Sequence, residues 1–193
     1  MRRSLRALQL LAVAVSTLTG ACAGCGPETT SFRALDKGDD AELPGAAYDV
    51  RMGESPIATV HVWSNGGYVS ISKQPMTHVG FEIRNTSPQP IAFDTDALEL
   101  TTFDNTATQL PRAEITSIEP SGPTLRPVRP GAAILIGAYF AIPVRPRAVE
   151  AMQIGWALRT GDLRYVQFTR FTRDDDYPVV DAPHTADVIR MRD

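Results

Sequence analysis

The side chains best suited to holding a metal ion are few in this chain of 193 residues. His61 lies within one strand-like segment and His78 opens the next segment but one, so the two histidines could approach each other across a sheet, and Met76 adds a thioether two residues before His78. A thioether combined with imidazoles is a donor set that suits copper. No H-x-H or M-x-x-M cluster accompanies them. These residues define one hypothesis, a periplasmic accessory protein that handles a metal ion.

Carboxylates offer a second set of ligands. Asp94, Asp96 and Glu99, or the run Asp174–Asp176, could supply oxygen atoms to Ca²⁺. The glycine that an EF-hand loop requires is missing, and acidic turns between strands are common solvated features. A calcium site is therefore the weaker interpretation of these residues.

Catalytic groups form no recognisable pattern. The sequence contains no G-x-S-x-G elbow, no H-E-x-x-H motif and no phosphate-binding loop. Cys22 and Cys25 are the only thiols, and both precede the strand-like part of the chain. No structured histidine therefore stands beside them to activate a nucleophile. We expect a protein that is not an enzyme and uses no cofactor.

Arginine is concentrated in the second half of the chain. The net charge of −3 argues against a nucleic-acid partner, but residues 124–173 carry eight Arg against Glu150 and Asp162. Such a segment could present a surface to an anionic partner, either an envelope protein or an anionic glycan. The candidates are Arg145, Arg147, Arg159, Arg164, Arg170 and Arg173. Alternatively, these residues form ion pairs with the acidic first half of the chain.

The alternation of side chains along a strand groups some of these arginines. On a straight strand residues 164, 166, 168 and 170 point the same way, so Arg164 and Arg170 would flank Val166 and Phe168. Two apolar side chains are unusual on a solvent-facing row. The sequence alone also places Phe168 in the core, together with Trp63, Trp156, Phe81 and Phe140.

The first residues are typical of an export signal. Arg2, Arg3 and Arg6 precede a short apolar stretch, Ala7–Leu18, which small residues follow. This stretch is shorter than the ~20 apolar residues that a transmembrane helix needs. We therefore expect a cleaved signal peptide over residues 1–21.

The sequence around Cys22 adds an anchor. Leu18-Thr19-Gly20-Ala21-Cys22 resembles the lipobox of bacterial lipoproteins, in which the cysteine is acylated, with palmitate among the chains, and becomes the first residue. Cys25 is a poorer candidate, and cleavage after Ala23 would leave a soluble periplasmic or secreted protein instead. Ala23 in place of Asp implies sorting to the outer membrane. The resemblance thus makes the lipid bilayer a partner through Cys22.

The mature chain divides into three parts on composition. Residues 22–46 are polar and acidic and are expected to form a flexible tether after the lipidated cysteine. Residues 47–176 contain the strand-like runs, and residues 177–193 form a tail or a segment that covers a sheet edge.

Short alternating runs separated by turn residues predict an all-β domain. One hairpin is predicted where Ile57–Trp63 and Tyr68–Ser72 flank Asn65-Gly66-Gly67, and another at Gly161-Asp162. The remaining predicted strands are 79–84, 91–93, 98–103, 113–118, 133–142, 152–159 and 163–172. Spacing of 8–12 residues is typical of a sandwich or barrel.

The stretch VGFEIRNTSPQPIAFDTDALELTTFD, with PGAAILIGAYFAIP and LRYVQFTRF after it, resembles the immunoglobulin-like domains of exported bacterial proteins. These domains are two-sheet sandwiches used in adhesion, assembly or partner binding. The resemblance implies a single immunoglobulin-like, antiparallel two-sheet sandwich that follows a cleaved signal peptide and a flexible tether. It implies a binding or envelope-assembly role for the membrane-anchored protein, without naming the partner.

Overall fold

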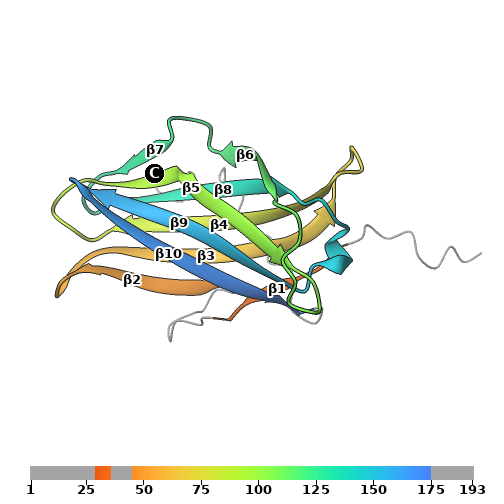
Figure 1. Ribbon diagram of the computed structural model, residues 1–193. Coiled ribbons are helices and arrows are strands. Elements are labelled where there is room, and N and C mark those ends of the chain that lie inside the picture. Colours follow the sequence, from red (N-terminus) through yellow and green to blue (C-terminus); the bar gives the residue numbers. More distant parts are fainter. Residues whose placement is uncertain (1–28, 36–44, 175–193) are drawn as a thin grey trace, which may run out of the picture.

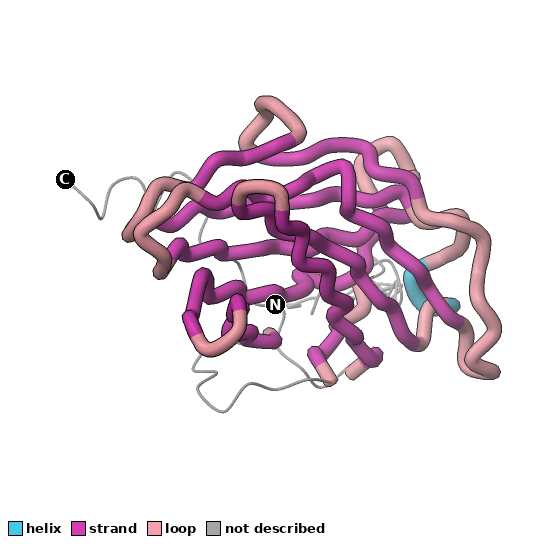
Figure 2. The backbone as a smooth tube through the Cα atoms, turned by 60° about the vertical axis from the view of Figure 1, so that its left-hand side comes forward, coloured by secondary structure: helices cyan, strands magenta, loops and turns pink. Residues whose placement is uncertain are grey.

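The protein is a sandwich of two antiparallel β-sheets (Figures 1 and 2). The computed structural model describes residues 29–35 and 45–174. Within these ranges the only helical element is a short 3₁₀ turn, η1 (Pro146–Ala148). The expectation of an all-β, two-sheet fold is confirmed.

Each sheet has five strands. Sheet A has the order β2 (Ala46–Met52), β3 (Ser55–Val69), β4 (Pro75–Asn85), β8 (Ala133–Ala141) and β6 (Glu114–Glu119). Sheet B has the order β1 (Phe32–Ala34), β10 (Leu163–Arg173), β9 (Ala151–Thr160), β5 (Ile91–Phe103) and β7 (Leu125–Val128).

The strand order contains the arrangement that defines an immunoglobulin-like sandwich. Strands β3-β4-β8-β6 correspond to the A-B-E-D sheet, and β10-β9-β5 correspond to G-F-C. Strands β2 and β1 are added at the edge of sheet A and the edge of sheet B, respectively. Strand β7 extends sheet B beyond β5.

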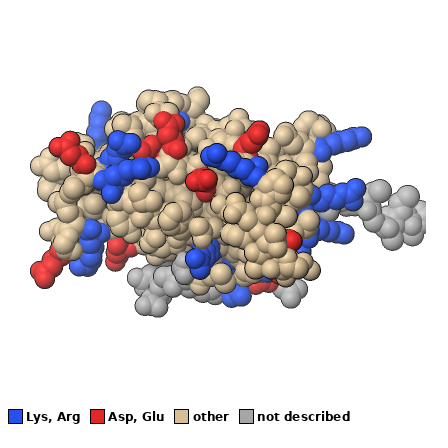
Figure 3. Space-filling model, viewed as in Figure 1, with Lys and Arg blue, Asp and Glu red and all other residues tan. Residues whose placement is uncertain are grey.

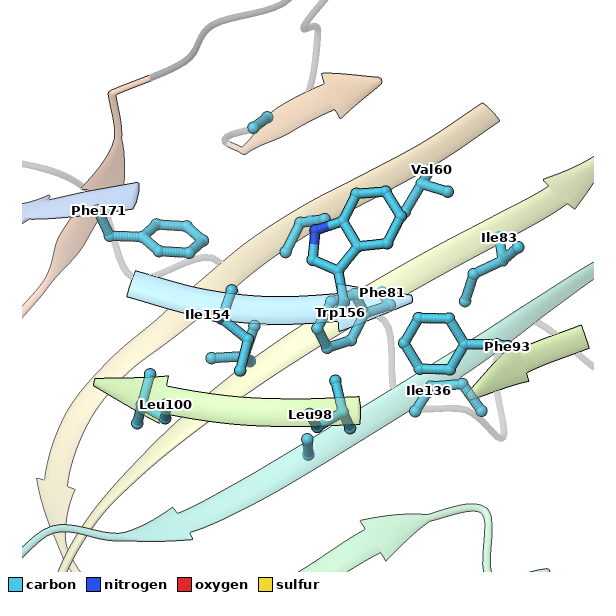
Figure 4. Packing of buried hydrophobic residues seen from close by; sticks show 14 of the residues in the cluster. Val60, Phe81, Ile83, Phe93, Leu98, Leu100, Ile136, Ile154, Trp156 and Phe171 are labelled. Atoms are coloured by element: carbon cyan, nitrogen blue, oxygen red, sulfur yellow. The ribbon is translucent and has the colours of Figure 1, made fainter. Parts of the chain in front are cut away.

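Alternating apolar residues of both sheets fill the space between them (Figure 4). Trp156 and Phe93 of sheet B meet Phe81 and Val60 of sheet A, and none of the four is more than 1% exposed. The indole N–H of Trp156 donates to Thr169 Oγ1 at 3.1 Å, so the largest core side chain has its polar group satisfied.

Two predicted turns are instead bulges inside long strands. Asn65-Gly66-Gly67 does not end a strand, because β3 continues to Val69 with a register shift between Ser64 and Gly67. Here Thr30 pairs with Gly67, and two backbone hydrogen bonds of 2.8 and 2.9 Å join them. Asp94-Thr95-Asp96 likewise lies in a bulge of β5. The predicted hairpin at Asn65-Gly66 is therefore wrong, while the one at Gly161-Asp162 is confirmed.

The stretch expected as a tether is partly ordered sheet. Phe32 and Ala34 lie in β1, pair with the end of β10 and are each 3% exposed. The expectation of a flexible segment therefore fails for this part of residues 22–46. The signal peptide (1–21), Cys22, Cys25 and the tail (177–193) lie outside the described residues. Within residues 29–35 and 45–174, no helix is long and apolar enough to cross a membrane.

Candidate functional site

An exposed row of side chains runs along the outer face of β10. Tyr165, Thr169 and Phe171 turn toward the core, so the intervening residues must point outward. Arg164, Val166, Phe168 and Arg170 therefore share one face, with Val166 49% and Phe168 51% exposed. Figure 3, viewed from the side of sheet B, shows basic and acidic side chains scattered over a face that is otherwise uncharged.

The neighbouring strand β9 carries small residues opposite the apolar side chains of this row. Phe168 lies opposite Gly155 of β9, and Val166 lies opposite Ala157. A Cβ atom placed on Gly155 would lie only 3.1 Å from Cε1 of the Phe168 ring. The ring therefore rests on the glycine backbone, which fixes an exposed aromatic side chain against the sheet.

A buried carboxylate lies next to two arginines at one end of this face. Asp94, whose side chain is 3% exposed, accepts hydrogen bonds from Arg159 Nε at 3.0 Å and Nη2 at 2.8 Å. Arg164 Nε lies 3.8 Å from the same oxygen atom. One carboxylate thus holds two half-exposed guanidinium groups side by side, and the predicted pairing with the first half of the chain occurs here.

The six candidate arginines do not form one surface. Arg170 donates to Gln153 Oε1 at 3.1 Å on the outer face of sheet B. Arg173 forms an ion pair with Glu150 at 2.9 Å and donates to the carbonyl oxygen of Arg147 at 2.8 Å, beside η1. Arg145 directly precedes η1. The set therefore separates into a sheet-face group (Arg159, Arg164, Arg170) and a group near η1 (Arg145, Arg147, Arg173).

The structure brings two of the three metal candidates together. Met76 and His78 lie two residues apart on the outer face of β4, where they are 8% and 7% exposed. His61 lies opposite Glu82, four positions further along β4. Trp63 lies opposite Gly80, between the two histidines, and stacks on His61 with ring centroids 5.4 Å apart. The two histidines therefore do not converge.

Burial controls the charge of His78. Its ring lies 4.5 Å from the Tyr139 ring, and Nδ1 has no hydrogen-bond partner among the described residues. Desolvation lowers the pKa of His78 to about 4, so the imidazole is neutral at pH 7. On the same face, burial and then the charge of Glu119 raise the pKa of Tyr68 and of Tyr139.

Three of the calcium candidates, Asp94, Glu99 and Asp174, lie near basic side chains, while Asp96 is exposed. Asp94 is held by Arg159, and Glu99 lies 3.9 Å from Arg112. Asp174 forms an ion pair with Arg33 at 3.0 Å, while Asp175 and Asp176 lie outside the described residues. In the part of the chain that the structure describes, no group of three or more His, Cys, Asp or Glu side chains is arranged to hold a metal ion.

Several residues were misplaced or missed by sequence reasoning. Trp156, Phe81 and Phe140 are in the core as expected, but Trp63 lies on the outer face of sheet A and Phe168 on that of sheet B. Strand β7 was not predicted, and with it the buried Arg126 was missed. The short run Leu125–Val128 contains a proline and an arginine, so it gave no strand signal.

Comparison with known proteins gives no functional assignment. No family model and no curated protein matches the sequence. A solved structure of a FixG-related protein from Vibrio parahaemolyticus is similar at 12% identity and a TM-score of 0.39, covering 60% of this chain and 94% of that one. An X-ray structure of the structural-genomics target SoR45 is similar at 11% identity and a TM-score of 0.37, covering 66% and 91%. Both TM-scores are too low to carry a conclusion.

Proposed function

We propose that this protein is an exported, membrane-anchored lipoprotein with a non-catalytic binding or envelope-assembly role. The sequence around Cys22 supports the anchor, and the outer face of β9 and β10 supports the binding role. The observation that carries the proposal is the pair of half-exposed apolar side chains, Val166 and Phe168, between Arg164 and Arg170. Exposed apolar patches with polar rims mark interaction sites.

The composition of this face favours a protein partner. Aromatic and arginine side chains are enriched at the energetic centres of protein interfaces. An anionic glycan would pair with the guanidinium groups but would leave Val166 and Phe168 without an apolar counterpart. We therefore propose an acidic protein of the cell envelope, and a glycan is the alternative that the experiment distinguishes.

The experiment is cross-linking in cells followed by purification of the full-length protein from membranes. The double variant Arg164→Glu/Arg170→Glu should lose a reproducible protein partner. Arg84→Glu, which reverses an exposed charge on the outer face of sheet A, is the matched control and should keep it. Recovery of the same partner with the double variant, or of an anionic glycan in place of a protein, would contradict the proposal.

A second candidate function, metal handling, is favoured by one observation. Met76 and His78 are neighbours on one buried strand face, and the low pKa of His78 leaves its nitrogen lone pair available at neutral pH. His78→Ala should then lower the affinity for Cu(I) in a competition assay. An unchanged affinity would end this candidate.

A further inference from the structure

Arg126 is a charged side chain in an unusual place. Strand β7 alternates, with Leu125 exposed and Arg126 and Val128 only 8% and 1% exposed. Arg126 lies opposite Phe93, a core residue that is 0% exposed. Its side chain therefore turns inward, at the rim where the β7 edge of sheet B faces sheet A.

The guanidinium group of Arg126 lacks a partner in the described chain. No hydrogen bond or ion pair joins it to another described residue, and its Nε atom is fully buried. Arginine stays protonated in proteins, so Arg126 cannot relieve this burial by losing its charge. A charge that is largely buried without a counter-charge is unfavourable, so the group that pairs with Arg126 is to be sought outside the described residues.

The loop between β6 and β7 arches over the upper rim of the sandwich in Figure 1, and its residue Gly122 lies against the guanidinium group of Arg126. A Cβ atom on Gly122 would overlap Nη1 of Arg126, so the loop approaches the guanidinium closely only because residue 122 has no side chain. Thr95 fixes the other end of the loop, since its N–H and its hydroxyl both donate to Thr124 O at 2.9 Å.

We propose that Arg126 is the binding residue for a carboxylate group of a ligand, at the rim between β6 and β7. The planar fork of arginine matches a carboxylate through two parallel hydrogen bonds. Arg129, the next basic residue along the chain, is exposed, so Arg126 is the one buried positive charge in residues 119–129. A singly charged carboxylate balances it, whereas a phosphate group usually collects several cations. This inference is independent of the β9–β10 face.

The test is a titration of the full-length protein with acetate, followed by amide NMR shifts and thermal melting at an ionic strength held constant with sodium chloride. The wild type should show saturable shifts at Thr124, Leu125 and Gly122 and a higher melting temperature. Arg126→Met should lose both responses, and Arg126→Lys should weaken binding about tenfold because it lacks the fork. Arg129→Met, which removes an exposed neighbouring arginine, is the matched control and should bind as the wild type does.

A second variant separates binding from folding. Gly122→Ala places a methyl group where Nη1 now lies, so it should weaken acetate binding while Arg126 remains present. Inorganic phosphate should bind no more tightly than acetate. Absence of a saturable response in the wild type, the same response in Arg126→Met, or tighter binding of phosphate would each overturn the proposal.

Discussion

At the scale of single residues, the neutral state of His78 has a consequence for stability. In the unfolded chain this imidazole takes up a proton near its ordinary pKa of 6.5, but in the fold only near pH 4. Between these two values the unfolded state binds more protons. The free energy of unfolding therefore falls as the pH is lowered through this window, by up to about 3 kcal/mol, and the contribution is fully present above pH 6.5.

Urea denaturation at pH 7 and near pH 4 measures this loss. Replacing His78 with Gln removes the titrating group, so the wild type should lose more stability between the two pH values than His78→Gln does. An NMR titration of the His78 ring gives the pKa directly. Equal losses in the two proteins, together with a ring that titrates near its ordinary pKa, would contradict the assignment.

At the scale of the elements, the outer surface of sheet A depends on an aromatic side chain that covers a glycine. Trp63 of β3 lies across Gly80 of β4, and a Cβ atom at residue 80 would overlap the indole ring. We expect Gly80→Ala to displace Trp63 and to lower the free energy of unfolding by about 1–3 kcal/mol.

Chemical denaturation and tryptophan fluorescence measure the effect of Gly80→Ala. The double variant Gly80→Ala/Trp63→Val should recover much of the loss, because the smaller side chain leaves room for the methyl group. A Gly80→Ala protein with wild-type stability and an unchanged emission spectrum would show that Trp63 does not rest on this glycine.

Local turn signals in the sequence predict some elements of the fold but not others. The β9–β10 hairpin follows from Gly161-Asp162, where Gly161 has a φ of 56° and the two strands pair locally. Asn65-Gly66 carries the same local signal, and Gly66 has a φ of 86°, but a residue distant in sequence, Thr30, pairs with Gly67 and the strand continues. A local pattern does not contain such a long-range contact.

For the candidate site, the grouping of residues follows from the local sequence, but their exposure does not. The two-residue repeat of a β-strand places Arg164, Val166, Phe168 and Arg170 on one face, and the structure confirms this grouping. Which face is buried depends on the opposing sheet. Phe168 and Phe171 have opposite phase, and packing of Phe171 into the core, where it is 1% exposed, places Phe168 outside. The contact between Arg159 and Asp94 joins residues 65 positions apart and could not be read from local sequence.

At the scale of the whole molecule, the proposed function requires a lipid anchor at Cys22. Cys22→Ser should abolish labelling with palmitate and move the protein from the membrane pellet to the soluble fraction. Cys25→Ser offers a matched control three residues away and should remain labelled and membrane-bound. Loss of the label in Cys25→Ser alone would reassign the anchor, and a soluble, unlabelled wild type would instead support cleavage after Ala23.

Binding of an acidic envelope protein to the outer face of β9 and β10, as proposed above, is tested most directly by site-specific photo-cross-linking in cells. A photoreactive amino acid replaces Phe168 in one strain and Thr59, an exposed residue on the outer face of sheet A, in another. We expect a discrete cross-linked protein from position 168 and none from position 59. No adduct at position 168 in a correctly localised protein, or the same adduct from both positions, would contradict the claim.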